Sequence, residues 1–169
     1  MTAPRSHALA AGALGAALLA WPGDSSGYSP LTPQCIGRAA NFVGVDALAL
    51  WMVLRTEGGS LGTIHRNADG SDDLGPFQIN TGTLRALAGR LGLPYARLER
   101  MARDEGCPAA ILAGFILREK ITGRKDGDIW DGLADYNSRT PGPHQRYLDR
   151  LRESYTALTR PVAPKKTAR

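Results

Sequence analysis

The residue in this sequence that is best placed for chemistry is Glu57, which follows the apolar run LALWMVLR and precedes two glycines. A carboxyl at the C-terminus of a helix faces the negative end of the helix dipole, and apolar neighbours keep water away from it. Both effects raise the pKa of a carboxyl toward neutrality, which suits a general acid. Position alone fits a partly exposed acid at a helix end equally well.

Two later segments decide between these interpretations: DLGPFQIN at residues 73–80 and LADYN at residues 133–137. Together with TEGG at residues 56–59, they resemble the lytic transglycosylases, the goose-type lysozyme-like family that cleaves peptidoglycan. That family has Glu-Ser-Gly or Glu-Ser-Ser at the end of a buried helix, then Gly-Leu-Met-Gln-Ile-Asn after an Asn-rich loop, and later Ala-x-x-x-Tyr-Asn. The resemblance extends from about residue 35 to residue 155 and needs no cofactor.

The resemblance implies a role for each matching residue. Glu57 matches the single catalytic acid, which protonates the oxygen of the bond between N-acetylmuramic acid and N-acetylglucosamine. It then helps the muramic C6 hydroxyl attack its own C1, which leaves a 1,6-anhydro product without water. Gln78 matches a glutamine that lines the substrate cleft. Tyr136 and Asn137 match a pair that faces the catalytic carboxyl.

Simpler interpretations of these residues stay open. Gln78 could tie down the loop backbone, Tyr136 could be a core residue, and Asn137 could cap a helix. The family's serine after the catalytic acid is replaced by Gly58, so any hydrogen bond from that serine is missing or comes from Ser60.

Two other functions fit the same scaffold. A true hydrolase would use water and a second carboxylate, for which Asp72 and Asp73 are candidates, although adjacent acids in a Gly- and Asn-rich loop are usually solvated. A glycan-binding or assembly protein would keep the fold without the activity. We expect no metal site, because His65 and His144 are isolated surface histidines and NADGSDD lacks the pattern of a calcium loop.

The bulk composition describes one soluble domain with a basic surface. The chain has 169 residues, a net charge of +5 and a pI of about 9.6. A basic chain favours polyanionic partners, but no basic patch is interleaved with aromatic residues, so nucleic acid is not expected. The expected partner is peptidoglycan glycan, and the protein is expected to be a monomer.

The N-terminal segment predicts export. A short basic start precedes the apolar run Ala8–Ala20, and small residues follow it, which is typical of a signal peptide at residues 1–26. A linker at residues 27–34, a domain at 35–158 and a basic disordered tail at 159–169 complete the chain. We therefore expect a periplasmic or secreted protein. Its small size resembles that of the specialised transglycosylases of secretion, conjugation or pilus machines.

The two cysteines, Cys35 and Cys107, are the whole cysteine complement of the chain. An even number in an exported protein predicts a disulfide, which would close a loop of about 70 residues and contribute about 4 kcal/mol. Two buried free thiols are the alternative.

The hydrophobic pattern predicts an all-α fold, and the resemblance makes it a lysozyme-like helical domain with one irregular loop or short β-hairpin near the active site. Asp46 and Gly58 are expected to cap the helix that ends at Glu57. Other helices are expected from Cys35 to Gly44, over 81–91 and 95–104, from a Cys107 cap, from an Asp128 cap, and over 144–158. The inner face of the Asp128-capped helix is expected to include Ile129, and that of the last helix is expected to pack Tyr147, Tyr155 and Leu158 against the core.

Overall fold

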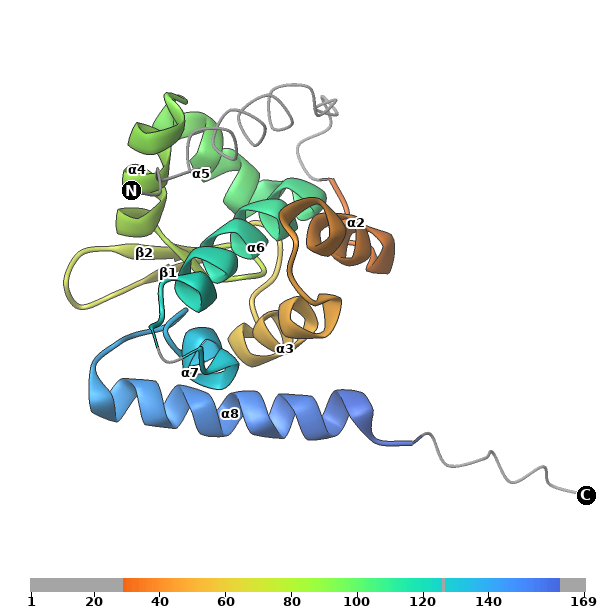
Figure 1. The fold of residues 1–169 in the computed structure, drawn as a ribbon. Helices are drawn as coiled ribbons and strands as arrows, with labels where there is room; N and C mark the ends of the chain where they lie inside the picture. Colours follow the sequence, from red (N-terminus) through yellow and green to blue (C-terminus); the bar gives the residue numbers. More distant parts are fainter. Residues whose placement is uncertain (1–28, 126, 162–169) are drawn as a thin grey trace, which may run out of the picture.

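The computed structural model describes residues 29–125 and 127–161, which form a helical lysozyme-like domain with a small three-stranded sheet (Figure 1). The predicted signal peptide and residues 162–169 of the predicted tail lie outside the described residues. Among the described helices, none is long and apolar enough to cross a membrane. The helices are α2 (Pro33–Val43), α3 (Ala47–Glu57), α4 (Thr81–Leu91), α5 (Tyr95–Asp104), α6 (Gly106–Thr122), α7 (Ile129–Ala134) and α8 (Pro141–Thr159).

Helix α6 is the centre of the core. Ten of its 17 residues are buried, and it packs against α2, α5 and α7. Gly114 lets α3 and α2 approach α6 closely, because a Cβ at this position would lie 2.8 Å from the Val43 side chain and 3.6 Å from that of Leu50. The small residues of α6, Gly114 among them, therefore allow the helices that carry the site to pack closely.

Helix α3 is capped at both ends as the sequence predicts. The Asp46 side chain accepts a hydrogen bond from the backbone N–H of Leu48 at 2.8 Å. At the other end Gly58 is in the left-handed region, with φ of +65°, and its N–H donates to the carbonyl of Leu54. A side chain with a Cβ is disfavoured there, so glycine ends the helix directly after Glu57.

The sheet consists of β1 (Ile64–Arg66), β2 (Asp72–Leu74) and β3 (Ile79–Asn80), paired antiparallel in the order β1-β2-β3. The expected hairpin is confirmed: its turn contains Gly70 at φ of +81°, and the Asp69 carboxylate accepts from the Ser71 N–H at 2.9 Å. The third strand was not expected. It places the segment that contains Gln78 directly beside β2.

The predicted disulfide between Cys35 and Cys107 is present, with the two Cα atoms 4.8 Å apart. It joins the start of α2 to the start of α6. Helix α2 begins two residues before the expected start, with Thr32 as its N-cap, so the end of the predicted linker is helical. Helix α6 begins at Gly106, so Cys107 lies inside the helix and is not its cap.

The C-terminal helix differs most from expectation. It begins at Pro141, ends one residue inside the predicted tail, and runs along the side of α3 and α7 (Figure 1). Tyr147, expected on its inner face, is fully buried, whereas Tyr155 is 41% exposed and Leu158 is 37% exposed. Ile129 in α7 is also exposed, at 47%. The apolar stripe therefore continues past the surface that α3 and α7 cover.

Candidate active site

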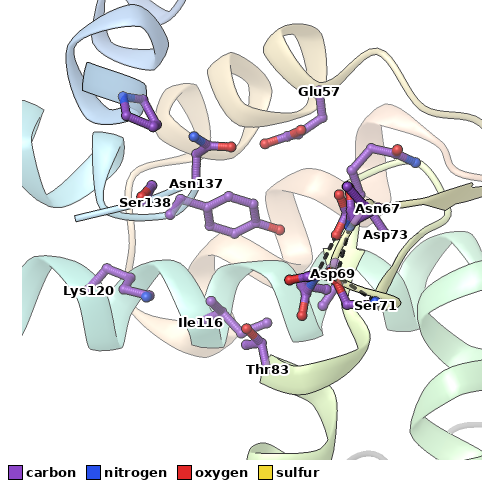
Figure 2. Close-up of a pocket in the computed structure, with 16 residues that line it drawn as sticks. Glu57, Asn67, Asp69, Ser71, Asp73, Thr83, Ile116, Lys120, Asn137 and Ser138 are labelled. Carbon is purple, nitrogen blue, oxygen red and sulfur yellow. Dashed lines mark hydrogen bonds between the residues drawn. The ribbon is translucent and has the colours of Figure 1, made fainter. Parts of the chain in front are cut away.

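A cleft of about 710 Å³ brings the sequence-predicted residues together (Figure 2). Its walls come from the end of α3, the sheet and its turns, α6, and the turn after α7. All four predicted site residues line it: Glu57, Gln78, Tyr136 and Asn137. Three segments that are far apart in the sequence therefore meet at one cavity.

Glu57 is held in the cleft by a tyrosine that the sequence analysis had assigned to packing. The hydroxyl of Tyr147, from α8, donates a hydrogen bond to Glu57 Oε1 at 2.6 Å. The Tyr147 ring is fully buried, so the hydroxyl needs a partner, and the carboxylate supplies one. A tyrosine that is expected to be buried must find a hydrogen-bond partner for its hydroxyl, and this requirement could have marked Tyr147 in the sequence. It does not say which residue the partner is.

The environment of Glu57 raises the pKa of its carboxyl from 4.5 to about 7, mainly because burial removes water from the charged form. The hydrogen bond from Tyr147 and the positive charge of Arg150 lower the pKa, and the negative charge of Asp73 raises it; all three effects are smaller than burial. A carboxyl with this pKa can give up and take back a proton near neutral pH. The raised pKa that the sequence predicts for Glu57 is thus found in the fold, with burial as its main cause.

Tyr136 lies in the cleft wall but does not hydrogen-bond to Glu57. Its hydroxyl donates to the backbone carbonyl of Phe77 at 3.0 Å and so ties the turn after α7 to the loop before β3. Burial raises the pKa of Tyr136 well above 10, and the nearby charge of Glu57 raises it further. Tyr136 is therefore a neutral phenol at physiological pH.

Gln78 has a strained backbone, with φ of +45°, the sole positive φ at a non-glycine position within the described ranges. Its side-chain amide donates to the carbonyl of Gly75 at 2.8 Å, and its backbone N–H donates to the same oxygen at 3.2 Å. Gln78 thus ties down the loop and lines the cleft at once. Gly59 completes this arrangement, because a Cβ there would collide with the Gly75 carbonyl and lie 2.8 Å from Gln78 Nε2.

Asn137 lies at the exposed rim of the cleft, and its amide points toward Glu57 across the cavity (Figure 2). It does not cap α7, because the C-cap is Asp135. Its backbone N–H donates to the carbonyl of Ala134 at 3.2 Å. The side chain is therefore presented to whatever occupies the cleft.

The structure separates the two adjacent acids of β2. Asp72 points away from the cleft and pairs with Arg66 at 3.0 Å. Asp73 lines the cleft, where its carboxylate accepts from Asn80 Nδ2 at 2.9 Å. Strand alternation explains the difference, because successive side chains of a strand point to opposite faces. Of these two adjacent acids, Asp73 is thus the one that lies in the cleft with Glu57.

A buried ion network holds the turn that carries Tyr136 and Asn137. Asp135 is 2% exposed and contacts Arg124 at 3.3 Å, Arg139 at 3.1 Å and His144 at 3.2 Å. His144 was expected to be an isolated surface residue, and that expectation is wrong. Its side chain is 15% exposed, and its second ring nitrogen lies 3.3 Å from the Asp131 carboxylate.

Metal ligation finds no support in the described ranges, where no group of three or more His, Cys, Asp or Glu side chains is placed to hold an ion. His65 lies exposed in β1, as expected for a surface histidine. Residues missed by the sequence analysis also line the cleft, among them Asn67, Asp69 and Lys120. Lys120 reaches the cavity from α6, on the side opposite Glu57 (Figure 2).

Comparison with known proteins gives a distant similarity. No family model matches the chain. The chain is 26% identical over 141 residues to the protein named invasion protein IagB from Salmonella typhi, a match that covers 80% of this chain and 84% of the relative. The same identity and coverage hold for the invasion protein IagB of Salmonella typhimurium strain SL1344.

Proposed function

We propose that this protein is a peptidoglycan lytic transglycosylase with Glu57 as its catalytic acid and base. The observation that carries the proposal is the geometry of Glu57: a partly buried carboxyl at the wall of an open cleft, with a pKa of about 7 and a phenol hydroxyl at 2.6 Å. A single carboxyl with such a pKa suits a reaction that needs first an acid and then a base at one position.

In the proposed reaction, protonated Glu57 gives its proton to the oxygen that links C1 of N-acetylmuramic acid to C4 of N-acetylglucosamine. The bond from C1 to that oxygen breaks, and the leaving sugar keeps the proton. The resulting carboxylate then accepts the proton of the muramic C6 hydroxyl as its oxygen bonds to C1. The product is a 1,6-anhydro ring, and Glu57 is protonated again for the next cycle.

The tyrosines of the cleft support both halves of this cycle. Tyr147 donates its hydrogen bond to the ionised form of Glu57, so it stabilises the carboxylate that the first step creates. Tyr136 remains a neutral phenol and holds the cleft wall through Phe77. Asn137 and Gln78 then supply amide groups at the cavity surface for the acetamido and hydroxyl groups of a sugar.

The proposed setting is the cell envelope, where the enzyme would open the wall locally. The disulfide fits an oxidising compartment, in agreement with the predicted export to the periplasm or outside the cell. A partnership with a secretion, conjugation or pilus machine is proposed from the small size of the domain, whereas the relatives at 26% identity are named only as invasion proteins. An enzyme that serves such a machine would cut a limited gap in the mesh.

A hydrolase on the same scaffold is the second candidate, and the position of Asp73 favours it. Asp73 lines the cleft and is close enough to Glu57 to influence the pKa of that carboxyl. A second carboxylate in this position could direct a water molecule at C1 in place of the C6 hydroxyl. The two reactions share the acid step and differ in the nucleophile.

Mass spectrometry of digested sacculi tests the proposal and separates the candidates. Wild-type protein is expected to release muropeptides with 1,6-anhydro ends, whereas reducing ends would establish the hydrolase. Glu57→Gln should abolish release, and Glu153→Gln, which changes an exposed acid of α8, should not. Sacculi that bind the wild-type protein without any release would show an inactive glycan-binding protein.

A further inference from the structure

A second hollow, of about 480 Å³, continues the cleft along α8. Its lining residues are Asn137, Pro143, Arg146, Asp149 and Arg150. Two of them, Asn137 and Pro143, also line the cleft that contains Glu57. A polymer bound in the cleft would therefore pass beside this α8 hollow, or place a substituent in it.

The α8 hollow is basic, in contrast to the cleft. Arg146 and Arg150 are one helical turn apart, so they lie on the same face of α8. Neither guanidinium forms an ion pair with an acid of the described chain. The acid beside them, Asp149, is engaged with Gln145 at 2.9 Å and with Arg152 at 3.6 Å. Arg146 and Arg150 are both exposed residues, so their guanidinium groups are available to an anion.

The α8 hollow is also coupled to the catalytic carboxyl. Arg150 lies 5.1 Å above the ring of Tyr147, and Tyr147 donates to Glu57. The positive charge of Arg150 lowers the pKa of Glu57. An anion bound at the hollow therefore lies within electrostatic reach of the reacting atoms, on the side of the cleft that α8 covers.

The chemistry of the substrate suggests which anion this is. The sugar rings of peptidoglycan are uncharged. Negative charge is carried by the carboxylates of the stem peptide, or by the lactyl group of a muramic residue whose peptide has been removed. The cleft itself presents three acids, Glu57, Asp69 and Asp73, against a single lysine, Lys120, so its lining has more acids than bases and disfavours such groups. A pair of arginines offers the planar, paired donors that match a carboxylate.

We infer that the α8 hollow is a specificity subsite in which Arg146 and Arg150 bind a carboxylate carried by a muramic residue of the glycan. This inference rests on the proposed function, because it assumes that the cleft holds a peptidoglycan strand. The carboxylate can belong to the lactyl group or to the stem peptide, and both have the same chemistry. The subsite selects peptidoglycan over uncharged β-1,4 glycans of the same backbone.

Arg146 is the residue to change, since Arg150 also influences Glu57. Rates of glycan cleavage are measured for wild type, Arg146→Ala, Arg146→Lys and Arg146→Glu. The substrates are intact sacculi and amidase-stripped glycan strands, whose lactyl groups are free. Each substrate is also tested after its carboxylates have been amidated. Arg160→Ala is the matched control: it removes the same charge from the C-terminal end of α8, outside the cleft and the α8 hollow. Circular dichroism checks that each variant is folded.

Arg146→Ala is expected to lower kcat/KM on carboxylate-bearing substrate by about threefold to tenfold, and Arg146→Glu by more, while amidated substrate shows no difference. Arg146→Lys should recover part of the loss, and Arg160→Ala should match wild type. A loss on intact sacculi alone assigns the stem peptide, and a loss on stripped strands assigns the lactyl group. An equal loss on amidated substrate, or no loss on any substrate, overturns the subsite.

A binding measurement keeps this test separate from the proposed reaction. Cosedimentation with sacculi compares Glu57→Gln with Glu57→Gln/Arg146→Ala, neither of which depends on turnover. Weaker binding of the double variant to intact sacculi, but not to amidated sacculi, supports the subsite even if the wild-type protein cleaves nothing. Equal binding of the two variants to intact sacculi and also to stripped strands, measured by isothermal titration calorimetry, overturns the subsite and leaves the reaction of Glu57 unaffected.

Discussion

Replacing Glu57 by glutamine is expected to stabilise the protein at alkaline pH while it removes the activity. The fold keeps water from the carboxyl, so the charged form costs free energy in the folded state that it does not cost in the unfolded chain. Glutamine has nearly the same shape and still offers an oxygen to the Tyr147 hydroxyl, but it cannot ionise. The substitution therefore removes the cost and keeps the contact.

The size of the effect follows from the pKa of Glu57, which is about 7 in the folded protein against an ordinary value of 4.5. A difference of about 2.5 pH units corresponds to about 3 kcal/mol, at 1.36 kcal/mol for each unit. Below pH 4.5 the carboxyl is neutral in both states and costs nothing. As pH rises from 4.5 to 7 the unfolded chain loses its proton first, so wild-type stability falls through that window.

Urea unfolding of wild type and Glu57→Gln at pH 4 and at pH 8 measures this difference. We expect nearly equal free energies of unfolding at pH 4 and an advantage of about 3 kcal/mol for the variant at pH 8. Glu153→Gln is the control, because it removes a carboxylate from an exposed position of α8 and should show no comparable change with pH. Comparing each variant with wild type at the same pH removes the contribution of all other titrating groups.

Two results would refute the reasoning. If Glu57→Gln and wild type were equally stable at pH 8, the carboxyl would ionise in the fold without cost. If the variant gained the same free energy at both pH values, the gain would come from packing and not from charge. Either result would also remove the argument that Glu57 is suited to act as an acid near neutral pH.

Four further substitutions test other parts of the structure. Tyr147→Phe removes a hydrogen bond to the charged form of Glu57, worth about 1.5 kcal/mol, so the alkaline limb of the pH–activity profile should move to higher pH; a move to lower pH would contradict this. Cys35→Ser opens the disulfide between residues 72 positions apart and should lower the free energy of unfolding in urea by about 4 kcal/mol, whereas an unchanged midpoint would argue against its role. Gly58→Ala should cost only about 1 kcal/mol, because its φ is +65° but an added methyl group meets nothing within 4 Å. Gly75→Ala, with the same φ and a carbonyl of α5 in the way of the methyl group, should cost about 3 kcal/mol or more, and equal melting temperatures for the two variants would contradict the difference.

The fold was largely predictable because its helices are defined by local signals. Asp46 and Gly58 set the ends of α3 through hydrogen bonds within the helix itself, and the sequence shows both caps. The errors lie where burial depends on distant elements. Tyr155 and Leu158 continue the apolar stripe of α8. The ring of Trp130 in α7 contacts that of Tyr155, with 5.6 Å between the centroids, yet Tyr155 stays 41% exposed and Leu158 37%. A hydrophobic pattern cannot show where its cover ends.

The candidate site was likewise predictable from the sequence only in part. Its motif residues were found from their types and order along the chain, and the cleft contains all of them. His144 was misjudged because its ion partners, such as Asp135, come from a different element. The strained backbone of Gln78 was equally invisible, since nothing in the sequence requires a positive φ at a glutamine.

The sequence by itself determined that an acid ends a buried helix, because capping and apolar periodicity act over a few residues. Only the tertiary structure decided what that acid meets. Tyr147 is 90 residues from Glu57 in the chain, and the choice of Asp73 over Asp72 depends on which face of β2 meets the cleft. Such contacts are set by the packing of whole helices and strands against one another, and no local pattern records them.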